Sequence, residues 1–433
     1  MLTEADGTAE LGTLVALQRG TTYKSSLLGY PGPVLLGLAS IQRDGGFRAD
    51  SLRTYGGESP SKLVLKPGDL YVSLKDVTQS GDLLGAVSRV PREVSAGRLT
   101  QDTVKLVFKN REVTPDYLYW VLRTPQYRSY CRARAIGTTN LSLSREDFLT
   151  FAIPNPTPGR VTMVRLLEDI EAKIELDRRT NETLESVARA IFKSWFVDFD
   201  PVRAKAEGRW PMGIDAETVA LFPASRTFGE IEIPTGWKWG RIGDVASSSA
   251  SAVDPRTLDA DTPYIGLEHM PRRRVVLDEW GQAGQVTSGK ARFRTTDVLF
   301  GKLRPYFHKV GIPPVQGVCS TDVLAVAPKS EIWLPFVLMH LSSDDLIDHA
   351  NGCSTGTKMP RVRWSDIARF EIAVPPERVA AAYGRLVNPM LRAATSSVLE
   401  SKTLAEVRDT LLPKLLSGEL RARDAEKIAE AHV

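Results

Sequence analysis

Residues 163–195 read MVRLLEDIEAKIELDRRTNETLESVARAIFKSW. Residues at alternating spacings of four and three form one helix face, which is the a/d pattern of a coiled coil. At about 1.5 Å per residue, such a helix is about 50 Å long, which suits a spacer better than a globular core. The face is polar in its middle, and its members are Met163, Leu167, Ile170, Ile174, Asp177, Asn181, Leu184, Ala188, Ile191 and Trp195.

A second helix of the same kind follows 220 residues later, where Arg385-Leu386-Val387 matches Arg165-Leu166-Leu167. Its face is again polar in the middle, at Ser397 and Ser401. The shared polar centre predicts that the two helices pair with each other as an antiparallel coiled coil. The alternative is that each amphipathic helix packs only on its own globular domain.

The globular parts are also repeated. The segment Ile136-Gly137-Thr138-Thr139 resembles Thr355-Gly356-Thr357-Lys358, and Leu11-Gly12 resembles Ile242-Gly243. Short apolar or alternating runs at 62–65, 69–74, 103–108, 263–267, 297–303 and 323–326 predict strands, while 117–122 and 334–341 read as helices.

We therefore predict an α+β fold, with two similar domains of mixed α/β structure separated by the paired helices. The predicted parts are a first globular domain (1–158), a first spacer helix (159–200), a connecting segment (201–233), a second globular domain (234–377), a second spacer helix (378–420) and a tail (421–433).

Composition excludes several classes of protein. The chain has 433 residues, of which 42% are hydrophobic and 25% charged, so it is neither disordered nor a small disulfide scaffold. No apolar run approaches the roughly 20 residues that span a bilayer. The three cysteines form no C-x-x-C pair, which favours the cytoplasm. The net charge of +4 permits a nucleic-acid partner without requiring one.

The search for catalytic motifs is negative. Residues 284–290 fit the glycine and lysine positions of a phosphate-binding loop, but Ala291 stands where Ser or Thr would bind magnesium, and a strand is expected next. The five histidines form no metal-ligand spacing. We predict that the chain is not an enzyme, with no catalytic residue, no metal ligand and no cofactor of its own.

Basic and aromatic residues cluster in corresponding loops of both copies. Lys and Arg neutralise phosphates, while Arg, Asn, Thr and Ser can read base edges, so this mixture indicates double-stranded DNA binding. The alternative for any single cluster is solvated surface charge. The candidates are Arg43, Arg48, Lys75, Arg132, Arg134, Thr138, Thr139, Asn140, Arg272, Arg273, Arg274, Arg292, Lys302, Arg304, Tyr306, His308, Thr357, Lys358, Arg361 and Arg363; Arg128 belongs to the same basic stretch of the first copy.

Aromatic residues at the end of the first helix exceed what a coiled coil needs. Trp195, Phe196 and Phe199 therefore indicate a docking surface, either for the second domain or for a partner chain. Leu415 and Leu416 near the end of the second helix complete the candidate docking residues.

Three segments carry a resemblance to a known family. KSWFVDFDPV (193–202), IPTGWKW (233–239) with Ile242-Gly243-Asp244-Val245, and LLPKLLSGEL (411–420) resemble conserved regions of the DNA-specificity subunit of type I restriction-modification systems. The resemblance implies that each globular domain is a target-recognition domain for one half of a bipartite DNA site, and that the helices set the gap between the halves.

It also implies partners. Two methyltransferase subunits would dock on the helix pair, and motor/nuclease subunits would join them for cleavage. S-adenosylmethionine, ATP and Mg²⁺ would be bound by those partner subunits. Two alternatives remain at this point. One is the specificity half of a fused restriction enzyme, which would need methyltransferase or nuclease sequence in the same chain. The other is a non-catalytic coiled-coil scaffold whose globular domains bind protein.

Overall fold

The computed structural model describes residues 7–50, 52–227, 233–248, 252–254, 257–286, 289–356 and 358–417. The predicted tail (421–433), the last residues of the predicted second helix and residues 228–232 of the connecting segment lie outside these ranges. The described residues divide into two compact units, one drawn from Met1–Lys173 and Thr403–Val433 and the other from Ile174–Lys402. The division crosses both long helices, and the predicted domain boundaries stay a prediction.

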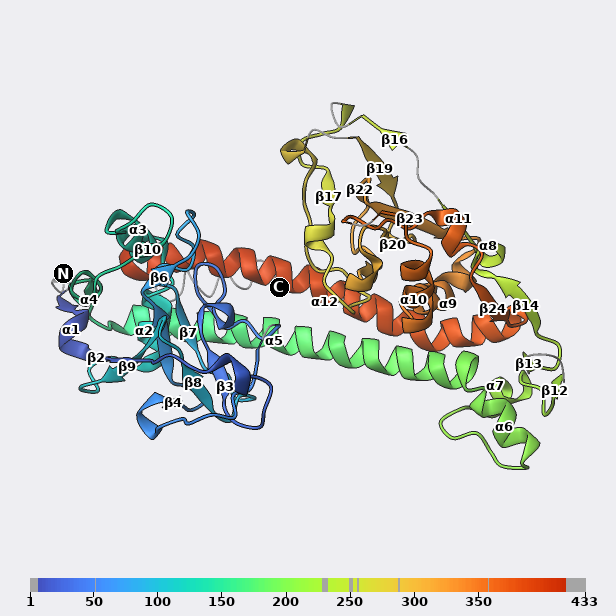
Figure 1. Ribbon diagram of the computed structural model, residues 1–433, viewed down its shortest axis with the longest axis horizontal. Helices are drawn as coiled ribbons and strands as arrows, with labels where there is room; N and C mark the ends of the chain where they lie inside the picture. The colour runs from blue at the N-terminus through green and yellow to red at the C-terminus, as the bar shows by residue number, and fades with distance from the viewer. Residues whose placement is uncertain are drawn as a thin grey trace. The chain divides into compact units, whose positions relative to one another are not determined.

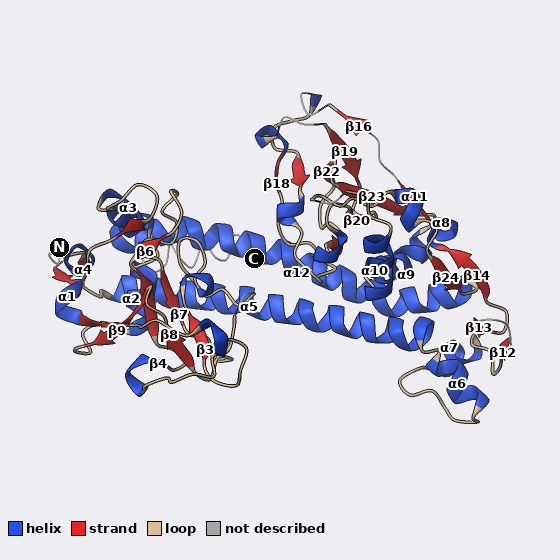
Figure 2. Ribbon diagram, in the orientation of Figure 1, coloured by secondary structure: helices blue, strands red, loops and turns tan. Residues whose placement is uncertain are grey.

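The first unit mixes helices and strands (Figure 1, Figure 2). Its strands are β1 (Thr8–Glu10), β2 (Val15–Arg19), β3 (Val34–Leu36), β4 (Val64–Leu65), β5 (Leu70–Ser73), β6 (Lys75–Asp76), β7 (Val87–Arg89), β8 (Gly97–Leu99), β9 (Thr103–Phe108), β10 (Leu141–Ser142) and β11 (Ala152–Pro154). Its short helices are α1 (Leu11–Leu14), α2 (Pro115–Val121), α3 (Pro125–Ala133) and α4 (Arg145–Leu149).

The second unit has the same mixed character. Its strands are β12 (Arg226–Thr227), β13 (Ile233–Pro234), β14 (Lys238–Arg241), β15 (Ala246–Ser248), β16 (Ala252–Val253), β17 (Pro263–Ile265), β18 (Gly281–Gln282), β19 (Lys290–Phe293), β20 (Val298–Gly301), β21 (Val310–Gly311), β22 (Gly317–Ser320), β23 (Val323–Pro328) and β24 (Glu371–Val374). Its shorter helices are α6 (Asp200–Ala206), α7 (Ala216–Ala220), α8 (Ile242–Val245), α9 (Leu334–Leu341), α10 (Asp344–Gly352) and α11 (Trp364–Ile367).

The internal repeat is visible in the sheets. The order β2-β9-β5-β7 in the first unit corresponds to β15-β23-β20-β21 in the second. The close approach of α1 to the end of α4 recurs as that of α8 to the end of α11, because a Cβ on Gly12 would lie 3.3 Å from the Leu149 carbonyl oxygen and one on Gly243 would lie 3.2 Å from that of Ala368. The repeated Leu-Gly and Ile-Gly pairs therefore mark positions where the backbone must come close to a neighbour.

Local sequence explains why the elements form where they do. β5 and β20 are buried at every position, as expected of central strands with continuous apolar runs. Thr114 and Thr124 cap α2 and α3, and a proline occupies the first turn of each helix, where its missing N–H costs nothing. A strand is predicted at 292–295, and β19 covers Lys290–Phe293, so the segment forms a strand and not the helix that a phosphate-binding loop requires.

The two long helices are α5 (Pro158–Phe192) and α12 (Glu377–Ser417). In the first unit, Arg160 Nε donates to the Leu415 carbonyl at 3.2 Å. In the second unit, Asn181 Nδ2 donates to the Ala394 carbonyl at 3.3 Å, and the Tyr383 hydroxyl donates to the Ala188 carbonyl at 3.1 Å. Partner numbers fall along α12 as they rise along α5, so the helices run antiparallel within each unit. Coiled-coil packing stays a prediction.

α12 continues through Pro413 to Ser417, within the bounds predicted for the second spacer helix. α5 instead ends in a π-helical turn, Lys193–Val197. After that turn Phe199 takes a left-handed conformation (φ 53°) and α6 begins. α5 and the π-helical turn together cover 158–197, and the first spacer helix is predicted for 159–200.

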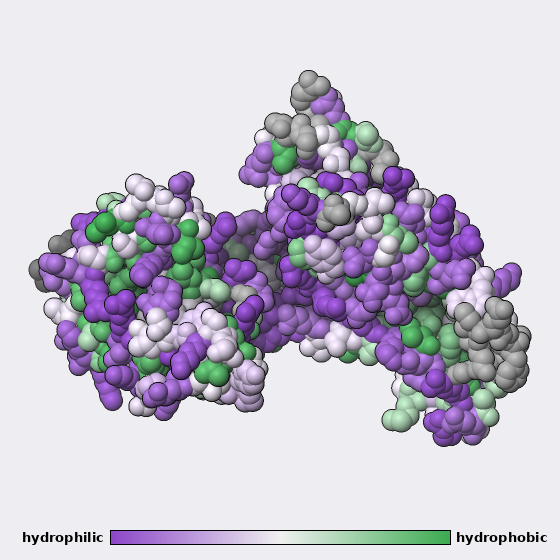
Figure 3. Space-filling model, viewed as in Figure 1, coloured by the Kyte–Doolittle hydropathy of each residue, from purple (hydrophilic) through white to green (hydrophobic). Residues whose placement is uncertain are grey.

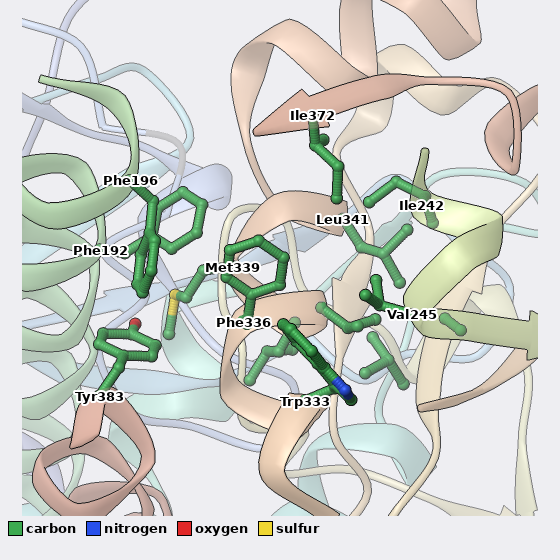
Figure 4. Close-up of a cluster of buried hydrophobic side chains, with 14 of the residues drawn as sticks. Phe192, Phe196, Ile242, Val245, Trp333, Phe336, Met339, Leu341, Ile372 and Tyr383 are labelled. Carbon is green, nitrogen blue, oxygen red and sulfur yellow. The ribbon is translucent and has the colours of Figure 1, made fainter. Parts of the chain in front are cut away.

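The core of the second unit joins its helix pair to its globular part. Figure 4 shows Phe192 and Phe196 from α5 and the following turn, with Tyr383 from α12, facing Phe336 of α9. Phe196 lies 4.9 Å from Phe336 and 5.1 Å from Tyr383, measured between ring centroids. Buried aromatic side chains contribute large apolar areas, so this cluster fixes α9 against both long helices.

Candidate nucleic-acid interface

In the first unit, the structure brings together two loops that are distant in sequence. β6 directly follows the buried strand β5 and pairs antiparallel with β10, which follows α3. Figure 1 shows β6, β10 and α3 as neighbours. The pairing places Lys75 beside the segment that follows α3. Six candidate residues in this region are exposed, namely Lys75, Arg132, Arg134, Thr138, Thr139 and Asn140.

The corresponding loops meet in the second unit. Leu303 and Arg361 form an antiparallel bridge, and the Arg304 amide donates to the Pro360 carbonyl at 2.8 Å. Arg304 Nη2 also donates to the Lys358 carbonyl at 3.2 Å. The loop after β20 and the loop after α10 therefore form one surface. That surface carries Lys302, Arg304, Tyr306, Lys358 and Arg361, with Tyr306 49% exposed.

In each unit a third loop, which contains Asp44 in the first unit and Arg273 in the second, contacts the surface formed by the two loops described above. Asp44 and Arg273 occupy matching places and are both left-handed, with φ of 59° and 60°. The Asp44 amide donates to the Asp82 carbonyl, and the Arg273 amide donates to the His308 carbonyl, each at 2.9 Å. The third loop brings Arg43 and Arg272 to the two surfaces.

Aromatic and acidic neighbours orient the basic side chains. Arg272 stacks over the Phe307 ring at 4.3 Å, and Arg134 stacks over the Tyr130 ring at 3.7 Å. Arg361 pairs with Asp322 at 2.8 Å. Ion pairs between exposed groups contribute only about 0–1 kcal/mol, so such an arginine could exchange its carboxylate for a phosphate at little cost.

Arg274 and His308 are candidate DNA-binding residues whose side chains are turned inward in the fold. The Arg274 side chain is 18% exposed and faces Glu182 at 3.3 Å and Glu185 at 3.7 Å. The His308 side chain is 5% exposed, and its Nε2 lies 2.8 Å from the Ser342 carbonyl oxygen. Burial lowers the pKa of His308, which disfavours the cation that a phosphate would attract. Both side chains stabilise loops from inside.

Arg128 has a similar structural role in the first unit, where its side chain is only 2% exposed. Its guanidinium donates to the carbonyls of Leu84, Asp82 and Gly81 at 2.5, 2.6 and 3.3 Å. It therefore supports the loop between β6 and β7 and does not present its charge on the surface.

The remaining candidates lie apart from these contacts or outside the description. Arg48 is exposed and pairs with Asp50 at 2.6 Å. Arg292 is exposed on β19, and Arg363 is exposed immediately before α11. Thr357 lies outside the described residues.

Three of the candidate docking residues, Trp195, Phe196 and Leu415, are buried. Trp195 and Phe196 are 2% and 4% exposed and belong to the core of the second unit, which agrees with the first alternative, docking for the second domain. Their role in docking a partner chain stays a prediction. Phe199 is half-buried and packs edge-on against Trp237. Leu415 is fully buried, so it is not a surface residue either, while the Leu416 side chain lies outside the described structure.

The loop that follows Lys75 holds further candidate functional residues, which are not among those predicted from the sequence. The Asp76 carboxylate accepts from the Thr78 amide at 2.8 Å and from the Leu83 amide at 2.7 Å, which closes the loop. Gln79 and Ser80 are exposed at its tip, where a Gln side chain suits the edge of adenine. The signal was the Asp-x-Thr turn followed by Gly81, which is left-handed (φ 70°).

Two absences apply to the residues that the structure describes. In that part of the chain, no group of three or more His, Cys, Asp or Glu side chains is placed to hold a metal ion. Within the same ranges, no helix is long and apolar enough to cross a bilayer. Hydrophilic side chains predominate on the face of the molecule drawn in Figure 3.

The fold matches a solved structure. The crystal structure of a type I restriction-modification system S subunit from M. genitalium aligns with a TM-score of 0.56 at 13% identity, covering 96% of this chain and 98% of that one. At this level of identity the match establishes the fold, which is that of type I S subunits. No protein-family model matches the chain.

Curated relatives with similar sequences are likewise specificity subunits of type I restriction enzymes. The type I restriction enzyme MjaIX specificity subunit of Methanocaldococcus jannaschii is 25% identical over 324 residues, which are 72% of this chain and 70% of the relative. The HindI specificity subunit of Haemophilus influenzae is 23% identical over 361 residues, 71% of this chain and 78% of the relative. The resemblance to the specificity subunits of type I restriction-modification systems is therefore confirmed.

Proposed function

We propose that this chain is the DNA-specificity subunit of a type I restriction-modification complex. Each unit binds one half of a bipartite double-stranded DNA site, and the helix pair sets the gap between the halves. The observation that carries the proposal is the recurrence, in both units, of the same three loops bearing basic and polar side chains.

The chemistry of these surfaces suits duplex DNA. Lys75 and Lys358 are exposed cations that can contact phosphates. The Asn140 amide offers one donor and one acceptor, and the Arg304 guanidinium offers paired donors, which are the groups that read base edges in the major groove. Two such surfaces on one chain fit a site of two parts better than a single continuous one.

The proposal assigns the chemistry to partner subunits. Two methyltransferase subunits would bind S-adenosylmethionine and dock along the helix pair, and motor/nuclease subunits would supply ATP- and Mg²⁺-dependent cleavage. This chain would be non-catalytic, bind no cofactor and act in the cytoplasm. A coiled-coil scaffold with protein-binding domains is the second candidate, favoured only by the length of α5 and α12.

Selection from a randomised duplex library tests the proposal, with the full chain and its methyltransferase subunits as bait. The wild type should enrich a two-part motif with a fixed gap. Arg304→Ala should weaken enrichment of one half about tenfold, because a lost base or phosphate contact costs about 1–3 kcal/mol. Asn140→Ala should do the same to the other half.

Arg209→Ala is the matched control, because Arg209 is exposed in the connecting segment and pairs with Glu207. It should leave both halves unchanged. Failure of the wild type to enrich any two-part motif would rule out the specificity function and favour the scaffold.

A further inference from the structure

Two side chains on one face of α5 hold the third loop of the second unit. Glu185 is buried, and its carboxylate accepts from the amides of Val275 and Val276 at 3.1 Å each. Arg189 follows one turn later, so the two side chains project from the same face of the helix. Arg189 Nη2 donates to the Arg273 carbonyl at 3.0 Å.

Arg189 also reaches the end of α9. Its Nη1 lies 3.3 Å from the Ser342 hydroxyl and 3.4 Å from the Ser342 carbonyl. That carbonyl lies 2.8 Å from His308 Nε2, and the His308 carbonyl in turn accepts from the Arg273 amide. A continuous set of hydrogen bonds therefore connects α5 to the loop that carries Arg304 and Tyr306.

The same loops contain unusual backbone conformations. Arg273, Arg304 and His308 have φ of 60°, 54° and 53°, and they are three of the five non-glycine residues with positive φ in the described chain. Such conformations are unfavourable for side chains with a Cβ, and they persist only where surrounding contacts enforce them. The contacts of Glu185 and Arg189 supply that enforcement at the third loop.

The first unit is attached to α5 by different chemistry. Arg123, which matches Ser342 in the repeat, donates from the globular part to Glu171 of α5 at 3.4 Å. In the second unit the arrangement is reversed, because the arginine, Arg189, is on α5 and the acceptor, Ser342, is on the globular part. Changes at Glu185 and Arg189 should therefore leave the first unit intact.

We propose that Glu185 and Arg189 are positioning residues that hold the DNA-reading loops of the second unit in register with α5, an inference that rests on the proposed specificity function. They contact no DNA themselves. Their effect is confined to the half-site that the second unit reads and to the permitted gap.

The test uses the full chain with its methyltransferase subunits in the same library selection. Glu185→Gln and Arg189→Met should each weaken enrichment of the half-site that depends on Arg304 by about tenfold, because a charge-assisted hydrogen bond is lost in a buried place. The half-site that depends on Asn140 should keep its enrichment, and the distribution of gap lengths should broaden. Arg189→Lys should keep part of the wild-type enrichment of that half-site, since lysine keeps the positive charge.

Glu175→Gln is the matched control, because Glu175 lies on α5 but pairs only with Arg178 and Arg179 of the same helix in the contacts described. Amide hydrogen exchange provides a second measurement, since Glu185→Gln should speed exchange at Val275 and Val276 in the free chain. Selection profiles equal to those of Glu175→Gln would overturn the proposal. Equal loss of both half-sites would also overturn it, because that indicates general unfolding.

These results are separable from failure of the proposed function. If the wild type enriches no bipartite motif, the specificity function itself is wrong. If the wild type enriches one and the variants behave like the control, only the positioning role is wrong.

Discussion

Individual side chains of the same type have opposite roles in this protein. Arg272 and Arg304 lie on the candidate DNA surface, whereas Arg274 and Arg128 are turned inward toward carboxylates or carbonyls. The difference arises from neighbours contributed by remote segments, such as Glu182 on α5 for Arg274. A basic residue in the sequence is thus a DNA ligand only if the fold leaves its guanidinium exposed.

His340 gives a residue-scale prediction about pH. It is buried between Phe192 and Phe336, and burial lowers the pKa of its imidazole to about 3. The unfolded chain binds the proton with a pKa near 6.5, so stability is complete above that pH and falls as pH drops toward 3. At pH 5 the loss is about 2 kcal/mol.

His340→Leu should remove the part of the pH-dependent loss of stability that is due to His340. Urea unfolding of the second unit at pH 7.5 and pH 5 measures it, as the difference in pH sensitivity between wild type and variant. Identical pH sensitivity in the two proteins would show that His340 is not held neutral in the folded chain.

At the scale of elements, polar side chains in the middle of the helix pair form hydrogen bonds between α5 and α12. Asn181 donates to the Ala394 carbonyl, and Ser401 Oγ donates to Asp177 at 3.2 Å. Polar groups in an otherwise apolar seam stabilise little but disfavour other registers, because a shifted register leaves them buried without partners. The polar layers thus account for the antiparallel register in the second unit.

Arg128 gives a prediction about how α3 supports the loop between β6 and β7. Arg128→Met should destabilise the first unit by about 3 kcal/mol, because the variant removes a buried charged donor that contacts three carbonyls of the loop. Urea unfolding measures the loss. Arg132→Met, which removes an exposed pair with Asp44 at 3.5 Å, should cost no more than about 1 kcal/mol. Equal effects of the two variants would contradict the supporting role.

At the scale of the whole molecule, the proposed function makes the length of the helix pair the determinant of the gap between half-sites. We expect that one heptad inserted into α5 near Asp177–Asn181, with a matching heptad in α12 near Ser397–Ser401, lengthens the pair by about 10 Å. At about 3.4 Å per base pair, the preferred gap should grow by about three base pairs while both half-sites stay the same. Library selection with the partner subunits measures both quantities.

The control is the same heptad inserted into the connecting segment beside Arg209, which should leave the gap unchanged. A variant that keeps its gap but prefers different half-site sequences would contradict the spacing role of the helices.

The sequence by itself determined the internal repeat, the two long helices and most central strands, because these depend on periodicity that each segment carries locally. The 4-3 spacing from Met163 predicts α5, and the run at 297–303 predicts β20. It also determined the resemblance to specificity subunits, through short motifs such as KSWFVDFDPV.

Only the tertiary structure decided which candidate residues share a surface. Arg304 meets Pro360, and Arg273 meets His308, through hydrogen bonds between segments far apart in the sequence. The burial of Trp195 and the contacts of Glu185 and Arg189 likewise depend on elements packed from elsewhere in the chain. Local pattern fixes what each segment becomes, but burial and hydrogen-bond partners are properties of the packed molecule, so they decide what each side chain can do.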